Sequence, residues 1–213
     1  MYKKYFRHEK GITGLETAII LIAFVVVAAV FAYTVISAGL FSTQKGQEAI
    51  YSGLKEAQSI VVIKGPVIAT GNTTGIDGNV RQITFIVSNI VGGEAIDFNP
   101  PTADNLTGQA AAGSLNGVVI NFVSQDQNVE NLYWTITKVG NDNGDSMLDK
   151  GEKFQITVGG DSDTSGAGNL INALDPDLGI NTSFSLVIIT TAGAPLTLER
   201  TTPAYIDTIM NLR

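Results

Sequence analysis

Cysteine is absent from the 213 residues, and histidine occurs once, as His8. Without cysteine the chain has no disulfide, no thiolate metal site and no thiol nucleophile. A single histidine close to the start leaves the remainder without the Ser-His and Cys-His arrangements of familiar hydrolases. The net charge of -7 argues against nucleic acid as a partner, because surfaces that bind nucleic acid are basic. We therefore expect a protein that is not an enzyme.

Basic residues are scarce except at the start of the chain. Residues 1–11, MYKKYFRHEKG, carry four basic residues and one acidic residue, whereas the whole chain has 13 and 20. The first eleven residues are therefore basic and the remainder is acidic, and we interpret the two parts separately.

An apolar run from Ala18 to Ile36 follows this basic start, with Glu16 at its entrance. A basic stretch before an apolar run is the outline of a secretory signal. This run is nearer transmembrane length, however, and no clear small-x-small cleavage site follows it. A plain signal-anchor is one interpretation, but it does not explain a costly carboxylate beside the run.

The junction KGITGLE, from Lys10 to Glu16, resembles the leader of class III signal peptides, the type IV prepilin group. The resemblance implies that a membrane peptidase cuts between Gly11 and Ile12. Residues 1–11 would then be the cleaved leader, and the apolar segment would be retained. Glu16 would become the fifth residue of the mature chain, where this group carries its glutamate.

Cleavage would create a positively charged α-amino group on Ile12, and Glu16 could pair with it in its own or a neighbouring subunit. The alternative is local, because a carboxylate in the first turn of a helix interacts favourably with the helix dipole. The local effect does not explain tolerance of the charge in a bilayer before assembly.

One long helix is predicted over residues 12–63, because proline is absent from Leu15 until Pro66. Its first part is apolar on almost every face and needs lipid or other helices around it. After Gly39 only one face is apolar, at Ile50, Leu54, Ala57 and Val61.

From residue 66 to 213 the apolar period shifts to two, and clusters of Gly, Asn, Asp and Pro separate the alternating stretches. The class is therefore α+β, with a long hydrophobic helix before an immunoglobulin-like antiparallel sandwich. The alternating residues are Ile83, Phe85, Val87, Val118, Ile120, Phe122, Trp134, Ile136, Phe154, Ile156, Val158, Phe184, Leu186, Ile188, Leu196 and Leu198.

The junction, the segment GLETAIILIAFVVVAAVFAYTVISAGLFSTQKGQEAIYSGLKEAQS and the β region together resemble archaeal flagellin, the archaellin family. The resemblance implies a structural subunit that leaves the membrane and polymerises through its helix into an extracellular filament for swimming. It also implies two partners, a prepilin-type peptidase and a motor platform at the filament base. Independently, a helix apolar on nearly every face must be buried by copies of itself, and contacts that do not close give a fibre.

Two alternative functions remain open. An adhesive pilin of the same superfamily would share the leader and Glu16 but would not rotate. A membrane-anchored enzyme or binding protein would need a functional set, and only turn-like carboxylate pairs are available, at Asp161 and Asp163 and at Asp175 and Asp177.

The stretch NDNGDSMLDKGE has oxygen-bearing residues at the spacing of a calcium loop, and hard oxygen ligands without His or Cys favour Ca²⁺. We expect a structural calcium ion there, with Leu148 in the core; the alternative is an Asx-rich hairpin turn. The ligand residues would be Asn141, Asn143, Asp145, Asp149 and Glu152, with the Met147 carbonyl, and Asp142 in a shifted register.

Three Asn-x-Ser/Thr sequences mark candidate N-glycosylation sites at Asn72, Asn105 and Asn181. Asn72 and Asn105 are expected in turns and Asn181 near a strand start. Ordinary turn asparagines are the alternative for each of them.

Overall fold

The computed structural model describes residues 10–58, 61–89, 94–104, 106–160, 169–191 and 194–212, with helix side chains described from residue 14 to 54. The chain divides into two compact units, one ending at Ser52 and the other beginning at Gly53. The elements are α1 (Lys10–Gln58), β1 (Val61–Ile63), β2 (Val67–Thr73), β3 (Asn79–Asn89), β4 (Ile96–Asp97), β5 (Val118–Ser124), β6 (Asn128–Val129), β7 (Trp134–Lys138), β8 (Met147–Leu148), β9 (Lys153–Val158), α2 (Leu170–Ala173), β10 (Ser183–Thr190), β11 (Leu196–Thr201) and β12 (Ile209–Leu212).

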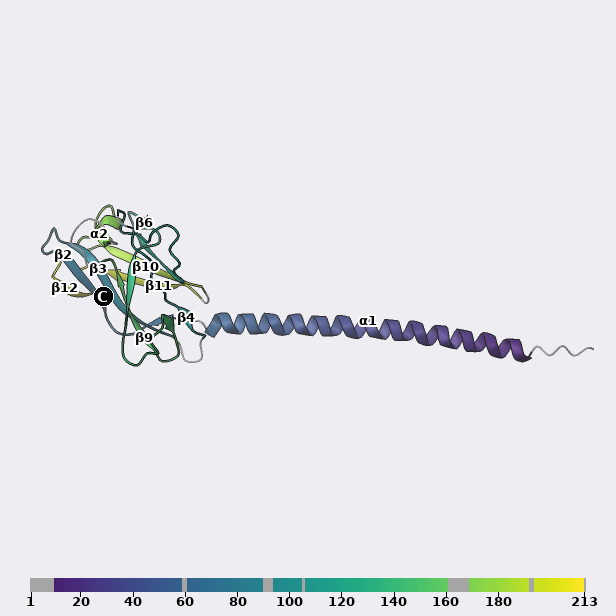
Figure 1. Ribbon diagram of the computed structural model, residues 1–213. Coiled ribbons are helices and arrows are strands. Elements are labelled where there is room, and N and C mark those ends of the chain that lie inside the picture. The colour runs from purple at the N-terminus through teal and green to yellow at the C-terminus, as the bar shows by residue number, and fades with distance from the viewer. Residues whose placement is uncertain are drawn as a thin grey trace, which may run out of the picture. The chain divides into compact units, whose positions relative to one another are not determined.

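Helix α1 is a single unbroken element of 49 residues (Figure 1). It has no proline, and the leucines, alanines and paired polar residues along it suit a helix. Its valines and isoleucines are weak helix formers in water, but in lipid the backbone must bond to itself. The structure confirms the predicted long helix, but the helix ends at Gln58 and not at residue 63.

The expected end at residue 63 is wrong because Val61–Ile63 forms strand β1. Val61 is 3% exposed and pairs with Asn89 of β3, and Ile63 pairs with Val87. Three consecutive β-branched residues favour a strand, and pairing with β3 buries the first of them. The β region therefore begins before residue 66.

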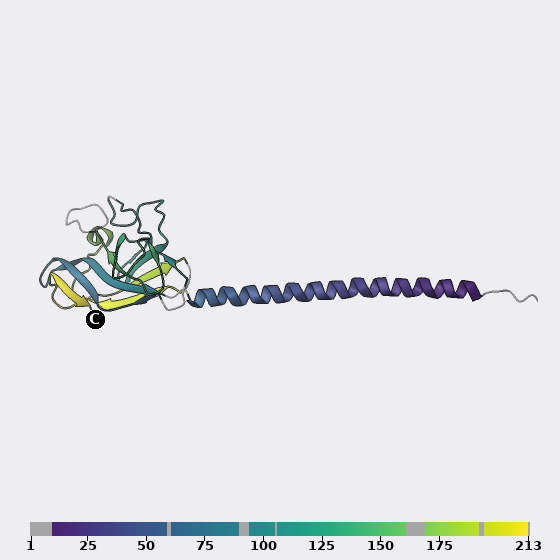
Figure 2. The same cartoon turned by 60° about the horizontal axis from the view of Figure 1, so that its bottom comes forward.

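Two antiparallel sheets make up most of the β region (Figures 1 and 2). One has the order β12-β2-β3-β9-β7, with β1 also on β3, and the other has the order β11-β10-β5-β6. A third, two-stranded sheet pairs β4 with β8. Figure 2 shows the last strand, β12, beside β2, where Met210 pairs with Ala69. The α+β class, a long helix followed by antiparallel sheets, is confirmed.

One hydrophobic core joins residues from both large sheets. Phe122 of β5 and Phe184 of β10 stack with ring centroids 5.5 Å apart. Phe98 forms T-shaped contacts with Trp134 and Phe154, at centroid distances of 6.1 and 6.0 Å. Every residue of the predicted alternation on β3, β5, β9 and β10 is buried, so period two identified the core faces correctly.

One strand, β12, follows Leu198, which is the last residue of the predicted alternation. Met210 and Leu212 are 8% and 3% exposed, whereas Ile209 and Asn211 face outward. The backbone of Asp207, just before β12, passes so close to Gly71 that a Cβ there would lie 2.6 Å from the Asp207 carbonyl oxygen. The chain end is thus an integral edge strand.

Candidate functional sites

The proposed processing junction lies within the backbone of α1, which begins at Lys10. The surroundings of Gly11 and the side chain of Ile12 lie outside the described part of the chain. Glu16 is exposed and lies in the second turn of α1, and the first turn holds no acidic residue. Because the dipole effect fades within the first turn, it does not account for Glu16 in the uncut chain.

The surface of α1 is apolar over a length that exceeds a bilayer crossing. Residues Gly14–Leu54 qualify by length and composition as one membrane-spanning candidate among the described residues, with mean hydropathy 3.0 in the best window. All the described side chains of this helix are exposed, and Phe24 and Phe31 are 74% and 70% exposed. The described part of the chain therefore leaves the apolar side chains of this segment uncovered.

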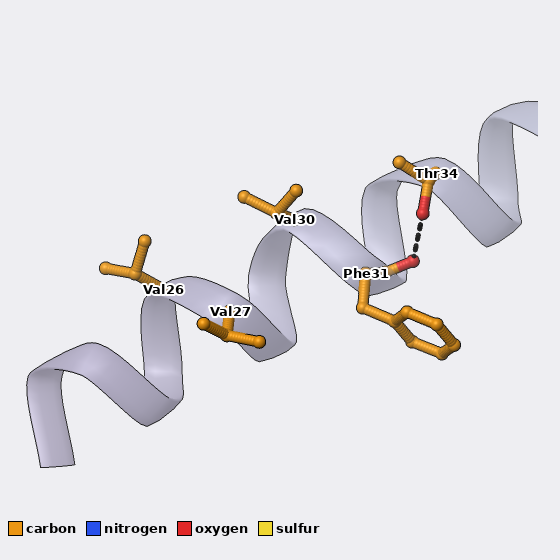
Figure 3. A pocket seen from close by; sticks show the side chains of 5 residues that line it. All are labelled: Val26, Val27, Val30, Phe31 and Thr34. Atoms are coloured by element: carbon orange, nitrogen blue, oxygen red, sulfur yellow. Dashed lines mark hydrogen bonds between the residues drawn. The ribbon is translucent and has the colours of Figure 1, made fainter. Parts of the chain in front are cut away.

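Threonine hydroxyls along α1 bond back to its own carbonyl groups. Figure 3 shows the Thr34 hydroxyl donating to the Phe31 carbonyl at 2.8 Å, beside the apolar hollow of Val26, Val27 and Val30. Thr17 and Thr43 donate in the same way to the carbonyls three residues before them, at 3.0 and 2.8 Å. A hydroxyl satisfied within its own helix needs no water, which suits a lipid or protein environment. Sequence reasoning missed these bonds, although threonine inside an apolar helix was the available signal.

The acidic loop between β7 and β9 is held by its own backbone N–H groups. Glu152 is 8% exposed, and its two carboxylate oxygens accept the N–H groups of Asn143 at 3.0 Å and Asp149 at 3.1 Å. The Asn143 side chain amide donates to the Asp149 carboxylate at 3.0 Å. The structure therefore brings together three of the predicted ligand residues.

The other predicted ligands occupy short turns along the same loop. Asp142 accepts the Gly144 N–H at 2.8 Å and lies 3.7 Å from the Lys138 ammonium. Asp145 accepts the Met147 N–H at 2.8 Å. These donors and Lys138 reduce the repulsion among the carboxylates of the loop. Asn141 is exposed at the start of the loop.

The predicted core position of Leu148 is confirmed, because this residue is 0% exposed and pairs with Ile96. Beneath the loop, the buried Asn89 amide donates to the carbonyls of Glu94 at 2.7 Å and Leu148 at 3.2 Å. Sequence reasoning missed Asn89, which ends an alternating stretch before two glycines. In the described part of the chain, no three His, Cys, Asp or Glu side chains form a metal-binding group, so any cation site depends on amide and carbonyl oxygens as well.

The three asparagines of the Asn-x-Ser/Thr sequences differ in what the structure describes around them. Asn72 is exposed near the end of β2 rather than in a turn, and its amide donates to the Asn79 side-chain oxygen at 3.3 Å. Asn181 is exposed two residues before β10, with a φ of 49°. Asn105 lies outside the described residues.

The carboxylate pair at Asp175 and Asp177 lies in a turn that hydrogen bonds from side chains hold in place. The Asp177 carboxylate accepts the Asn79 amide at 2.6 Å, and the Asp175 N–H donates to the Gln127 side chain at 3.0 Å. Gln127 also donates to the Pro176 carbonyl at 2.6 Å, which anchors this turn. Asp161 and Asp163 lie outside the described residues.

The described side chains of α1 are exposed, and its apolar part needs lipid or other helices around it, whereas the β region has a buried core of its own. A sequence profile described as archaeal-type flagellin matches residues 11–200. Probable flagellin 1 of Archaeoglobus fulgidus is 36% identical over 212 residues, covering 100% of this chain and 99% of that protein. Probable flagellin 1 of Aeropyrum pernix is 31% identical over 213 residues, covering 95% and 96%. The chain belongs to the archaeal-type flagellin family, whose members are structural filament subunits and not enzymes.

Solved structures agree with this family. The archaeal flagellum of Methanospirillum hungatei matches with a TM-score of 0.60 and 26% identity, over 93% of this chain and 98% of that chain. An archaeal flagellin of Methanocaldococcus jannaschii shares the fold, with a TM-score of 0.50 and 12% identity, over 71% of this chain and 95% of that chain.

Proposed function

We propose that this chain is inserted into the cell membrane as a precursor, cleaved between Gly11 and Ile12, and polymerised through α1 into the extracellular filament of an archaeal flagellum. The observation that carries the proposal is the exposed apolar surface of α1 between Ala18 and Phe41, in the helix segment Gly14–Leu54 that qualifies as a membrane-span candidate. Burying a large aliphatic or aromatic side chain from water contributes about 1.5–3 kcal/mol, so monomers of this helix are unstable outside lipid.

Glu16 has a specific role in this proposal. No residue between Glu16 and Lys45 is charged, so α1 offers no partner to this carboxylate in the apolar segment. The α-amino group that cleavage would create on Ile12 supplies an opposite charge, in the same subunit or in a neighbour. An ion pair in a dry bundle requires good geometry, and it would fix the axial register of adjacent helices.

The implied partners are a prepilin-type peptidase and a motor platform at the filament base. The Gly11→Val variant tests the peptidase step, because a branched side chain before the cut should block cleavage. The expected result is an uncut, membrane-bound precursor and no filaments, measured by immunoblotting of membranes and sheared filaments. Normal filaments from this variant would overturn the proposed processing.

The swimming role is favoured over the adhesive pilin by the family match over residues 11–200. Deleting the gene and restoring it should abolish and then recover swimming, scored by tracking cells in liquid. A deletion strain that swims normally but no longer attaches to surfaces would favour the adhesive role.

We also propose that the loop from Asn141 to Glu152 binds a structural Ca²⁺ ion. The proposal is supported by the proximity of three oxygen-bearing residues: Asn143 contacts Asp149 through its side chain, and Glu152 contacts the backbone of both. Amide and carboxylate oxygens are ligands of the kind calcium prefers. Bound calcium would connect β7 and β9 and stiffen the β region. A fragment of residues 53–213 should unfold at a higher temperature with calcium than with chelator, and Asp145→Ala should weaken calcium binding. An unchanged midpoint and unchanged binding would favour the Asx-rich turn.

For glycosylation we propose Asn72, Asn105 and Asn181 as acceptors. The exposure of Asn72 and Asn181 supports this proposal, because an attached glycan is bulky and must lie on the surface. Intact-mass measurement of filament protein from wild type and each Asn→Gln variant tests each site. An unchanged mass would reject the corresponding site.

A further inference from the structure

The outward side of the β11-β10-β5-β6 sheet carries almost no charge. Glu199 is the only charged residue at the outward positions of the described strands β5, β10 and β11, and Val123 and Ile189 are 37% and 42% exposed there. An antiparallel sheet with one face toward water is typically polar on that face, whereas loss of charge is typical of the centre of an interface. The outward residues are Val119, Asn121, Val123, Ser183, Ser185, Val187, Ile189, Thr197, Glu199 and Thr201.

A hollow of about 230 Å³ lies in this face beside Glu199. Ser185 of β10 pairs with Glu199 on one side and with Val123 on the other, so a short side chain lies between two longer ones. Ser183, two residues earlier, and Gln125 line the same hollow. No cationic residue is among those that line it, so the hollow supplies no counter-charge to the carboxylate. Its shape and charge suit the end of a long cationic side chain, with the apolar stem of that side chain against Val123.

The outward side of the other large sheet carries an exposed lysine next to uncharged rows. Ser88 of β3 pairs with Lys153 of β9, and Lys153 is exposed. The neighbouring Glu152 is buried, and its carboxylate is held by backbone N–H groups. Because the two sheets enclose one core, their outward sides face away from each other, and Glu199 does not meet Lys153 of its own chain. The uncharged rows are Ile86, Gln155 and Thr137, and then Ile68, Thr84, Thr157 and Thr135.

The partner that fits the hollow is a second copy of this chain. The chain belongs to a family of filament subunits, and in an assembly whose contacts do not close each contact joins two different surfaces of the subunit. One β region presents two such surfaces on its opposite sides. Both are poor in charge, one has a carboxylate in a hollow, and the other has a lysine. Opposite charges placed in this way fix the register of two surfaces.

We infer that the outward side of the β11-β10-β5-β6 sheet packs on the β3 and β9 side of the neighbouring β region, with the partner subunit's Lys153 in the hollow beside Glu199. The ammonium group of that lysine donates to the Glu199 carboxylate and the Ser185 hydroxyl, and its stem covers Val123. The uncharged rows surround this pair and exclude water from it. The inference rests on polymerisation, and it adds a contact between β regions to the contacts of α1.

Pairs of introduced cysteines test this contact directly, because the chain has no cysteine of its own. Lys153→Cys and Glu199→Cys are combined in one full chain, and sheared filaments are treated with a short bismaleimide, which spans farther than a disulfide. Because every subunit presents both surfaces, the double variant should give a ladder of covalent multimers on denaturing gels. Each single variant should stay monomeric. Filaments of the double variant that give no ladder would overturn the inference.

The matched control is Lys153→Cys combined with Asp77→Cys, because Asp77 is exposed in the turn between β2 and β3, away from the hollow. This pair should give no ladder, and a ladder equal to that of the Glu199 pair would overturn the assigned contact.

Exchange of the two charges supplies a second measurement. Glu199→Lys and Lys153→Glu should each lower the temperature at which filaments disassemble, followed by light scattering, because each change places like charges together. Both changes in one chain restore an opposite pair and should recover much of the loss, whereas losses that simply add would overturn the inference. Asp77→Lys makes the same change of charge elsewhere and should leave the temperature close to wild type.

These outcomes are distinct from failure of the proposed function. Immunoblotting of the membrane and of sheared filaments shows whether each variant is inserted, cleaved and assembled. Filaments of processed subunits without a ladder would contradict only the contact between β regions. A wild-type chain that forms no filaments would contradict polymerisation itself.

Discussion

Replacing Glu152 with glutamine tests how the acidic loop is held without reference to any metal. The carboxylate is 8% exposed and accepts two backbone N–H groups, from Asn143 at 3.0 Å and Asp149 at 3.1 Å. Glutamine keeps one oxygen and turns an NH₂ group toward the other donor. One charge-assisted hydrogen bond is therefore lost, which costs about 1.5–3 kcal/mol.

The cost corresponds to a measurable shift in the unfolding temperature. In a domain of roughly 150–250 residues, 1 kcal/mol lowers the midpoint by about 2–4 °C, so Glu152→Gln should lower it by about 3–12 °C. The assay is thermal unfolding of residues 53–213, followed by circular dichroism in excess chelator. This fragment retains β1 and the whole core, whereas a fragment starting at residue 66 would lack Val61.

Glu130→Gln supplies the matched control, because Glu130 is exposed and the same chemical change should shift stability by no more than about 0.5 kcal/mol. The comparison isolates the two hydrogen bonds from the loss of one negative charge. Equal midpoints for wild type, Glu152→Gln and Glu130→Gln in chelator would refute the argument that these hydrogen bonds hold the loop.

Three other predictions concern assembly, pH and packing. Glu16→Gln should be inserted and cleaved but assemble poorly, since breaking one side of a buried ion pair costs about 3–5 kcal/mol; normal filament yield would contradict the pairing. The N–H groups of Leu106 and Thr107 lower the pKa of Asp104, so its stabilising effect is complete above the ordinary pKa of 3.8 and is lost as pH falls through the lower folded value. NMR titration of Asp104 in residues 53–213 should show this lower pKa, and an ordinary value would contradict it. Phe98→Ala should destabilise that fragment by about 3–5 kcal/mol, measured by urea unfolding, because Phe98 is 0% exposed; a loss below 1 kcal/mol would show that the site tolerates the cavity.

Sequence periodicity predicted the elements that have a long, one-sided pattern. Phe85, Phe122 and Phe154 lie on alternating stretches, and all three are core residues. The apolar run of α1 was recognisable because few environments other than lipid or neighbouring helices suit it. Length and pattern together therefore identified the helix and the main strands.

The elements that were missed are those whose identity depends on a partner. Val61 continued the helical spacing of the residues before it, yet pairing with Asn89 places it in a strand. β4 and β8 have two residues each, too few to show a period, and are defined by the pairing of Ile96 with Leu148. Tertiary contacts override local pattern in such short segments.

The acidic loop between β7 and β9 was likewise predicted only in part. The spacing of oxygen-bearing residues and the buried position of Leu148 followed from the sequence. The hydrogen bonds from backbone N–H groups to Glu152 did not, because they depend on how the loop folds back between β7 and β9. The structure thus shows backbone N–H donors beside the carboxylates, whereas the sequence shows only that the carboxylates are closely spaced.

The most direct test of the central claim is N-terminal sequencing of the protein in filaments sheared from the cell surface. The account predicts a chain that begins at Ile12, with Glu16 as its fifth residue, and that retains the apolar segment after it. Filament protein that still begins with residues 1–11, or that begins beyond the apolar segment, would contradict polymerisation through a processed α1.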